Sequence, residues 1–226
     1  GKKLFVADTG NRRIRMIDLA AAGNPVTTIA GDGSVGDRTG TGNQAQFKAP
    51  CALAFDGSTV YVVDQLDGRV RKLLPPFTSA STTVVIGYFG ALDIGYTEGN
   101  FDIAKYDFTH DGGAIVAGPK FNFLVADSGN QRIRLHTDTL GSRTLAGGGT
   151  RGAEGVPGAF RDGPATVGAA SALAQFNDPQ GIAYWGDLKA GVCYVADTKN
   201  HRIRRFAVKD MPDPTAGGGP GAYRLR

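Results

Sequence analysis

A ten-residue pattern that recurs four times constrains the fold of this chain more than any other feature. Each copy fits V-[AV]-D-x-x-[ND]-x-R-[IV]-R without a gap. A pattern that returns in register along a chain indicates repeated supersecondary units that stack on one another. The copies occupy residues 6–15, 62–71, 125–134 and 195–204, and their aspartates stand 56, 63 and 70 residues apart.

A second landmark lies between these copies. It is a glycine followed seven residues later by an aromatic residue and, three residues after that, by proline or threonine. In the third copy the first interval is 13 residues. Differences in loop length therefore account for the unequal spacing of the repeat. The landmark residues are Gly40, Phe47 and Pro50, then Gly99, Tyr106 and Thr109, then Gly163, Phe176 and Pro179.

Each unit reads as four short strands. In the first unit, residues 4–8 form a β-rich run, and Gly10 and Asn11 supply a tight reversal. Residues 13–17 then alternate apolar and basic side chains, the period of two that is typical of a strand. Further strands are predicted at 26–31, 51–55, 82–89, 142–148 and 181–185. No segment has a helical apolar period. One such meander cannot bury both of its faces, so neighbouring units must stack.

Residues 195–203 (VADTKNHRI) and 174–183 (AQFNDPQGIA) resemble the NHL repeat, a family of β-propeller blades. The resemblance covers residues 1–208 and implies an all-β propeller of four-stranded antiparallel blades, with about four blades present. Residues 209–226 form a Gly/Pro-rich tail with at most one closing strand, at 222–226. The second unit departs most from the family pattern, since QLDG at 65–68 replaces T-G-N-x.

The chain begins on the second strand of a blade, so the first blade lacks its innermost strand unless the tail or another segment supplies it. A closed ring needs that edge to be covered. We therefore expect the blades of an incomplete or externally completed propeller rather than a free-standing four-bladed ring. The total number of blades stays open.

The repeated acidic and amide residues are interpreted as structural, because Asp and Asn side chains bond to nearby backbone N–H groups in turns. These residues are Asp8, Asn11, Asp64, Asp67, Asp127, Asn130, Asp197 and Asn200. The arginine pairs of the pattern are placed on an outer strand, in water or paired with these aspartates. The alternative is an RNA-binding ring of basic residues. The net charge is only +4 and no aromatic residues are interleaved, so nucleic acid is not favoured.

No enzyme signature stands out. Two G-x-G-x-x-G matches, at 31–36 and 147–152, are not followed by a helix and are interpreted as inter-blade loops. Because NHL-like lyases use a channel metal, a metal-dependent lyase or hydrolase is kept as an alternative. His110, His136 and His201 fall in dissimilar positions, so we predict no cofactor and no metal site, with calcium in the acidic loop 32–37 left open. Cys51 and Cys193 are predicted to be unpaired.

The inter-blade loops at 30–50, 87–113 and 146–179 are long, dissimilar and Gly-rich, whereas the hairpins are nearly identical. Binding surfaces on repetitive scaffolds usually lie in such loops. We therefore predict a non-enzymatic protein-interaction or structural scaffold module, with other proteins or further blades as partners. The candidate contact residues are Tyr88, Phe89, Tyr96, Phe101, Arg151, Phe160 and Arg161. The alternative is that the aromatic residues pack beneath their own loop.

The sequence holds no apolar run of about 18 residues, so no membrane span is predicted. The compartment stays open, and an extracellular or cell-surface location is favoured among the alternatives.

Overall fold

The computed structural model describes residues 2–81, 83–91, 93–100, 103–109, 112–118, 121–138, 141–147, 174–186 and 190–209. The other residues, among them the tail and most of the loop 146–179, lie outside this description. The strand predicted at 222–226 therefore lies outside it as well.

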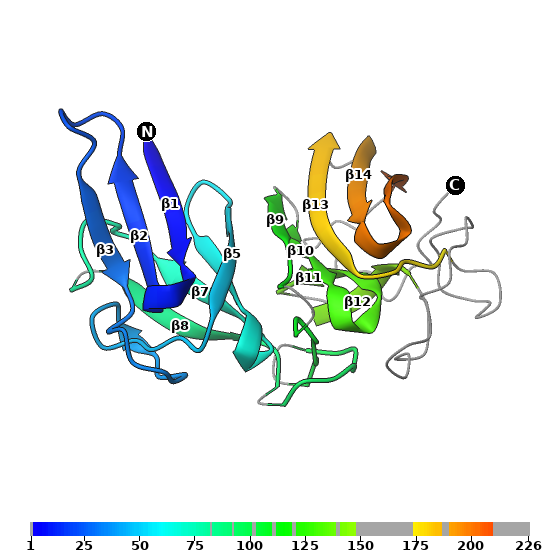
Figure 1. The fold of residues 1–226 in the computed structure, drawn as a ribbon, viewed down its shortest axis with the longest axis horizontal. Helices are drawn as coiled ribbons and strands as arrows, with labels where there is room; N and C mark the ends of the chain where they lie inside the picture. The colour runs from blue at the N-terminus through cyan, green and yellow to red at the C-terminus, as the bar shows by residue number, and fades with distance from the viewer. Residues whose placement is uncertain are drawn as a thin grey trace.

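The described chain is all-β, and its strands form four antiparallel sheets that we call blades 1 to 4 in chain order (Figure 1). Blade 1 consists of β1 (Lys3–Asp8), β2 (Arg13–Asp18) and β3 (Val26–Ala30). Blade 2 consists of β5 (Pro50–Phe55), β6 (Val60–Asp64), β7 (Arg69–Leu74) and β8 (Val84–Phe89), with β4 (Gly40–Thr41) added beside β8. Blade 3 consists of β9 (Ile115–Gly118), β10 (Phe121–Asp127), β11 (Arg132–Thr137) and β12 (Gly141–Ala146). Blade 4 consists of β13 (Pro179–Gly186), β14 (Ala190–Asp197) and β15 (Arg202–Lys209).

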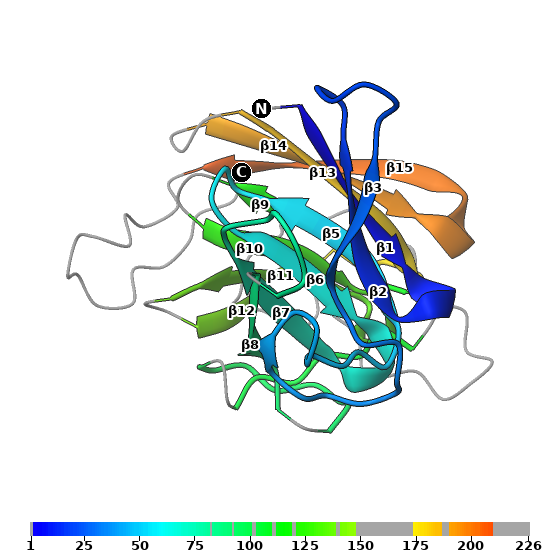
Figure 2. The ribbon, with the colours of Figure 1, turned by 90° about the vertical axis from the view of Figure 1, so that its left-hand side faces the viewer.

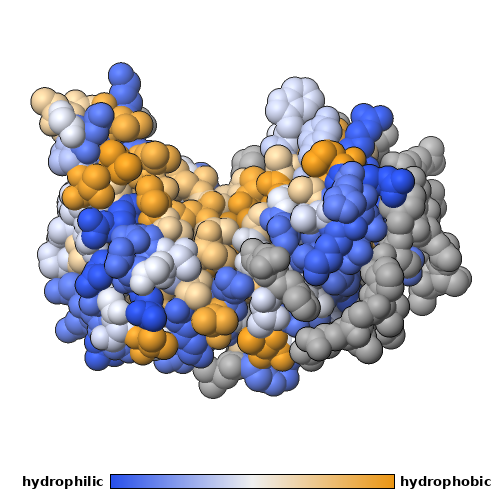
Figure 3. All heavy atoms as spheres, viewed as in Figure 1, coloured by the Kyte–Doolittle hydropathy of each residue, from blue (hydrophilic) through white to orange (hydrophobic). Residues whose placement is uncertain are grey.

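The blades form an open propeller arc, which confirms the predicted fold class. The sheets follow one another around the arc, and the described strands do not close it into a ring (Figures 1 and 2). Blade 1 has the strand order β1-β2-β3, so β1 is an edge strand, as the sequence predicted. Between blades 1 and 4 the molecular surface is hollowed into a wide notch (Figure 3).

The hydrophobic core lies between the blades rather than within them. Each of its three clusters joins the facing sides of two consecutive blades and contains one landmark aromatic residue. Phe47 lies in the cluster between blades 1 and 2, Tyr106 in that between blades 2 and 3, and Phe176 in that between blades 3 and 4. All three are 3% exposed or less. A single blade therefore has no core of its own, as expected of a stacked repeat.

The hairpin turn of the repeat is a single 3-10 turn that ends on a residue in the left-handed conformation. The left-handed conformation falls on the residue after the repeated Asn or Asp, with φ of 54° at Arg12, 58° at Gln131 and 53° at His201. Only blade 2 places a glycine there, Gly68, with φ of 66°. Gly10 does not have a positive φ. The turn therefore accepts a non-glycine residue in the left-handed region of backbone angles, which such residues generally disfavour.

The landmark glycines mark where each inter-blade loop reaches the outer edge of the next blade. Gly40 pairs with Val85 of β8, and Gly99 pairs with Ser142 of β12. Both glycines have a positive φ, 128° and 141°, that side chains rarely adopt. The chain then returns inward to the aromatic residue and the innermost strand. Gly163, the third landmark, lies outside the described residues.

Candidate functional site

The repeated aspartate, asparagine and second arginine form one buried polar cluster, which we call the clamp. In blade 3, Asp127 accepts hydrogen bonds from the Asp107 backbone N–H at 2.7 Å, from Asn130 Nδ2 at 2.8 Å and from Arg134 Nη1 at 3.0 Å. Asp127, Asn130 and Arg134 are each 0% exposed. A buried ion pair is stable only when its remaining donors and acceptors are also hydrogen-bonded. In this cluster most of these groups have such a bond.

The clamp holds the lead, the segment that precedes the innermost strand of the same blade. Arg134 donates from Nη1 to the Lys105 carbonyl at 3.1 Å and from Nη2 to the Thr97 carbonyl at 2.9 Å. Its guanidinium carbon lies 5.1 Å from the ring centroid of Tyr106, within the range of a cation–π contact. The landmark aromatic residue is therefore the partner of the repeated arginine.

Blades 2 and 4 repeat this arrangement. Arg71 donates to the Gln46 carbonyl at 3.1 Å and Arg204 to the Gln175 carbonyl at 3.0 Å. Their guanidinium carbons lie 5.3 and 5.4 Å from the rings of Phe47 and Phe176. The aspartates accept backbone N–H bonds from the lead in both blades, Asp64 from Lys48 and Ala49, and Asp197 from Asn177.

Blade 2 has an aspartate, Asp67, where the other units have asparagine. Its buried carboxylate is neutralised by two cations, Lys48 Nζ at 2.7 Å and Arg69 Nε at 2.6 Å. These contacts hold the pKa of Asp67 below its usual value, against the opposing effect of burial. The departure of this unit from the family pattern is therefore compensated locally, and its strands form as predicted.

Burial raises the pKa of Asp64 and of Asp127 to about 6, against the opposing effects of backbone N–H groups and arginines. Carboxyl groups with raised pKa values are candidates for proton transfer. Both side chains are 0% exposed, however, and every bond described above runs to the protein itself. The bonds of these two carboxylates join the lead to the hairpin of the same blade.

The prediction that the arginine pairs lie on an outer strand is wrong for blades 1 to 3, whereas in blade 4 the pair lies on β15, an edge strand of the described sheet. β7 and β11 are interior strands of their sheets, and Arg71 and Arg134 are both 0% exposed. Their predicted pairing with the repeated aspartates is confirmed, at 3.8 Å in blade 2 and 3.0 Å in blade 3. Arg71 and Arg134 therefore offer no surface to a phosphate backbone.

Blade 1 carries the same residues without a lead. Asn11 Nδ2 donates to Asp8 Oδ1 at 2.9 Å, as in the complete clamps. Arg15 instead donates to Thr28 Oγ1 at 2.9 Å, and both Asp8 and Arg15 are partly exposed. Within the described residues no backbone N–H from a lead reaches Asp8.

The candidate contact residues of the second loop fall in different environments. Phe89 is 5% exposed and packs against Phe123 at 5.0 Å between centroids, so it belongs to the core. Tyr96 is 41% exposed, and its ring lies 4.0 Å from the guanidinium carbon of Arg132. Tyr88 lies in β8, and its side chain is outside the description. Phe101, Arg151, Phe160 and Arg161 also lie outside it.

His136 lies in the core between blades 2 and 3 and is 0% exposed. Its Nδ1 is 2.7 Å from Ser142 Oγ, which also bonds to Tyr106 Oη, and its ring stacks on Phe123 at 4.8 Å. Burial, together with the nearby cations Arg134 and Lys72, lowers the pKa of His136 to about 3. Both members of this serine–histidine pair are 0% exposed and lie within the core.

We predict that His136 makes the protein sensitive to acid. A histidine that stays neutral in the folded state binds its proton only on unfolding, so its contribution is present above pH 6.5 and lost as the pH falls toward 3. Relative to the variant His136→Asn, the wild type should lose about 1.4 kcal/mol of unfolding free energy for each unit between pH 6 and pH 4. Urea unfolding of both proteins across this range measures the difference. A difference that is independent of pH would contradict the assignment.

Both cysteines are unpaired, as predicted, with Cys193 buried and Cys51 partly exposed. Among the described residues, no group of three or more His, Cys, Asp or Glu side chains could hold a metal ion. The described part of the chain also contains no helix long and apolar enough to cross a membrane.

Apolar side chains are exposed on both sides of the notch. On blade 1 they are Leu4 and Val6 of β1, exposed by 50% and 36%, and Phe55 of β5 lies nearby with 49% exposed. Figure 3 shows hydrophobic side chains gathered on this side of the notch and across its floor. Blade 4 exposes Trp185, Tyr194 and Ile203.

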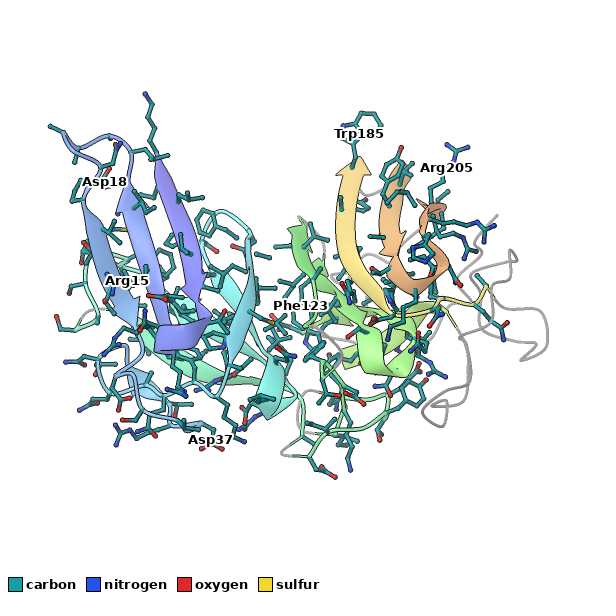
Figure 4. The ribbon with its side chains drawn as sticks, in the orientation of Figure 1. Arg15, Asp18, Asp37, Phe123, Trp185 and Arg205 are labelled. Atoms are coloured by element: carbon teal, nitrogen blue, oxygen red, sulfur yellow. The ribbon has the colours of Figure 1, made fainter. Side chains whose placement is uncertain are left out.

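Trp185, Tyr194, Ile203 and Arg205 lie on the same side of blade 4, which we call the blade 4 free face. Tyr194 stands opposite Arg205 in the sheet, and Ala196 stands opposite Ile203. Cys193 and Val195 alternate with these residues and point to the core against blade 3. Figure 4 shows Trp185 and Arg205 projecting away from the body of the molecule. The sheet thus carries apolar side chains on both faces, and within the described part of the chain only the face toward blade 3 joins a core cluster.

No protein-family model and no curated protein sequence matches the chain. Among solved structures, an auxiliary nutrient binding protein from Bacteroides thetaiotaomicron is similar, with a TM-score of 0.58 and 20% identity over 90% of this chain and 44% of that one. Its counterpart from Bacteroides ovatus gives 0.57 and 18% over the same shares. A nidogen/laminin complex gives 0.47 and 15%, over 94% of this chain and 62% of that one. The chain spans less than half the length of the two nutrient binding proteins, and the likeness to them is one of fold.

Proposed function

We propose that this chain is a non-enzymatic, protein-binding propeller module of the NHL type, and that the blade 4 free face is its contact surface. The partner would present a β-sheet face with aliphatic side chains, as a further blade does. Two proteins of similar fold are described as nutrient binding proteins, and the proposal extends a binding role to this chain.

The observation that carries the proposal is a comparison of equivalent positions. Three residues before the repeated aspartate, Tyr61 is 1% and Leu124 0% exposed, whereas Tyr194 is 41% exposed. Six residues after it, Val70 and Ile133 are 0% exposed, whereas Ile203 is 72% exposed. In blades 2 and 3 these positions pack against the next blade. A contiguous apolar surface of this kind generally marks an interaction site.

A binding role also agrees with the internal bonding of the repeated polar residues. The repeated carboxylates, amides and arginines of blades 2 to 4 are used to hold the leads. The inter-blade loops were predicted as a contact surface. One of their residues, Tyr96, is exposed, and its ring lies against Arg132. That loop surface is a second, more polar region through which a partner could be oriented.

Trp185 is the single tryptophan of the chain and reports directly on the blade 4 free face. It is 76% exposed, so we predict that its emission moves to shorter wavelength and its quenching by acrylamide weakens when a partner covers it. The simplest candidate partner is a second copy, whose Leu4 and Val6 hold the positions that face the preceding blade elsewhere. Emission followed against protein concentration, beside sedimentation velocity, measures this association.

The variant Ile203→Lys is the matched change, because it places a charge in the apolar surface without touching the tryptophan. It should abolish the concentration-dependent shift and leave the thermal midpoint within about 2 °C, since an exposed side chain contributes little to stability. Association that leaves Trp185 as accessible as before, or that Ile203→Lys does not weaken, would show that another surface binds.

A further inference from the structure

We infer that His136 makes the junction of blades 2 and 3 an acid-sensitive switch, which opens when the buried ring takes up a proton. The junctions of blades 1 and 2 and of blades 3 and 4 stay closed under the same conditions. This switch lies in the interior of the arc, and it does not depend on what covers the blade 4 free face.

The position of His136 in the repeat is the first reason. The ninth residue after the repeated aspartate is Ile17 in blade 1, Leu73 in blade 2, His136 in blade 3 and Phe206 in blade 4. Leu73 lies in the core cluster between blades 1 and 2, and Phe206 packs against the cluster between blades 3 and 4. The repeat therefore places an apolar side chain at this position in the other three units and an ionisable one in blade 3.

The ring of His136 is held between two blades and is 0% exposed. Its centroid lies 3.9 Å from that of Phe89 in blade 2 and 4.8 Å from that of Phe123 in blade 3. Its Nδ1 bonds to Ser142 Oγ, which also bonds to Tyr106 Oη. Its Nε2 is buried and has no hydrogen-bond partner within the described part of the chain. A protonated ring carries two N–H donors, so one of them would lack an acceptor until the junction opens to water.

The charged groups around the ring also oppose its protonation. Burial has the largest effect in lowering the pKa of His136, and Arg134 of the same strand and Lys72 of β7 lower it further. Asp127 of β10 is paired with Arg134 at 3.0 Å, and Asp138, next to the end of β11, is exposed. The other titratable side chains of β7, β11 and β12 are all cations, namely Arg69, Arg71, Arg132 and Arg143.

The sign of the pH effect follows from these contacts. The pKa of His136 is about 3 in the closed junction, against a usual value of 6.5 for a histidine in water. The open junction therefore binds the proton more tightly than the closed one. Between these two pH values, each unit of acidification favours the open junction by about tenfold.

The opening stays local because each junction has a core cluster of its own. In stacked repeats the stability is approximately a sum over units and over contacts between neighbours, so a weakened contact opens before the others. The two halves that remain each keep a complete cluster. Blades 1 and 2 enclose Phe47, and blades 3 and 4 enclose Phe176.

The two unpaired cysteines report on different junctions and supply the test. Cys51 packs against the cluster between blades 2 and 3, and its Sγ lies 4.0 Å from the carbonyl oxygen of Gly113, which precedes β9 of blade 3. Cys193 is 0% exposed and belongs to the cluster between blades 3 and 4. The whole chain is labelled with 4,4′-dithiodipyridine, a reagent that modifies thiols in acid, between pH 7 and pH 4. Mass spectrometry gives the rate at each cysteine, normalised to the rate of free cysteine at the same pH.

The ratio of the Cys51 rate to the Cys193 rate should rise as the pH falls below 6.5, by up to about tenfold for each unit. Far-ultraviolet circular dichroism should stay that of the folded protein, because the sheets of both halves remain. His136→Leu is the matched control, since Leu73 holds the equivalent position in blade 2, and in this variant the ratio should not change with pH. His136→Asn is a second control, which cannot titrate and keeps a polar side chain beside Ser142.

Acceleration of both cysteines together as the pH falls would show that acid unfolds the whole chain, and it would overturn the inference. A ratio that stays constant in the wild type, or one that rises as steeply in His136→Leu and His136→Asn, would overturn it too. The emission of Trp185 measures association at the blade 4 free face separately, so the two proposals can fail independently.

Discussion

The variant Asp127→Ala should unfold with about 3–5 kcal/mol less free energy than the wild type, because it leaves the buried Arg134 guanidinium without its counter-ion. It also removes the acceptor of the Asp107 N–H and the Asn130 amide. For a chain of this size such a loss lowers the thermal midpoint by roughly 6–20 °C. Differential scanning calorimetry and urea unfolding at pH 7.5 measure both quantities.

Asp8→Ala is the internal control for this experiment, because Asp8 occupies the same position of the repeat in a clamp that holds no described lead. Its carboxylate bonds to the exposed Asn11 amide, and its loss should cost about 1 kcal/mol or less. Equal destabilisation by the two substitutions would mean that the aspartate acts through the turn alone. That outcome would contradict the role assigned to the buried ion pair.

Phe89→Ala should destabilise the protein by about 3–5 kcal/mol, the usual cost of removing a buried aromatic ring. The ring lies 5.0 Å from Phe123 and 3.9 Å from the His136 ring, so its loss opens a cavity at the junction of blades 2 and 3. Urea unfolding monitored by far-ultraviolet circular dichroism measures the change.

Tyr96→Ala is the matched control, because the sequence predicted the same role for Tyr96 and Phe89. Tyr96 is 41% exposed and contributes mainly its contact with Arg132, so its loss should cost less than about 1 kcal/mol. Similar effects of the two substitutions would contradict the placement of Phe89 in the core and of Tyr96 at the surface.

The fold could be predicted because the repeat indicates both the individual strands and the way in which the units stack. The period-two alternation around Ile14 and Met16 identifies a strand, and the repetition of that strand identifies the stacked architecture. The position of β1 at the edge of its described sheet followed from the same count of strands. Each of these inferences uses local spacing, which a sequence displays directly.

The pairing of arginine with aspartate in the clamp was predicted, but its contact with the lead could not be, because the fold brings these parts together. Asp127 and the Asp107 backbone are 20 residues apart, and the link between Arg134 and Tyr106 spans 28 residues. The ten-residue pattern and the glycine–aromatic landmark repeat together, which was a signal that they contact each other. The alternation of side chains along a strand does not by itself show which face of the strand is buried. For the same reason Phe89 was predicted as a surface residue, although its neighbours lie on another blade. The blade 4 free face was missed because its residues occupy ordinary core positions of the repeat.

The pairing of the landmark glycines with the outer strands has a consequence for solubility. Through Gly40 and Gly99, the inter-blade loops occupy part of the edges of β8 and β12 that would otherwise be free to pair with strands of other molecules. The loops thus protect these blades against edge-to-edge aggregation, and a loop shortened at the glycine would lose that protection even if both blades still folded.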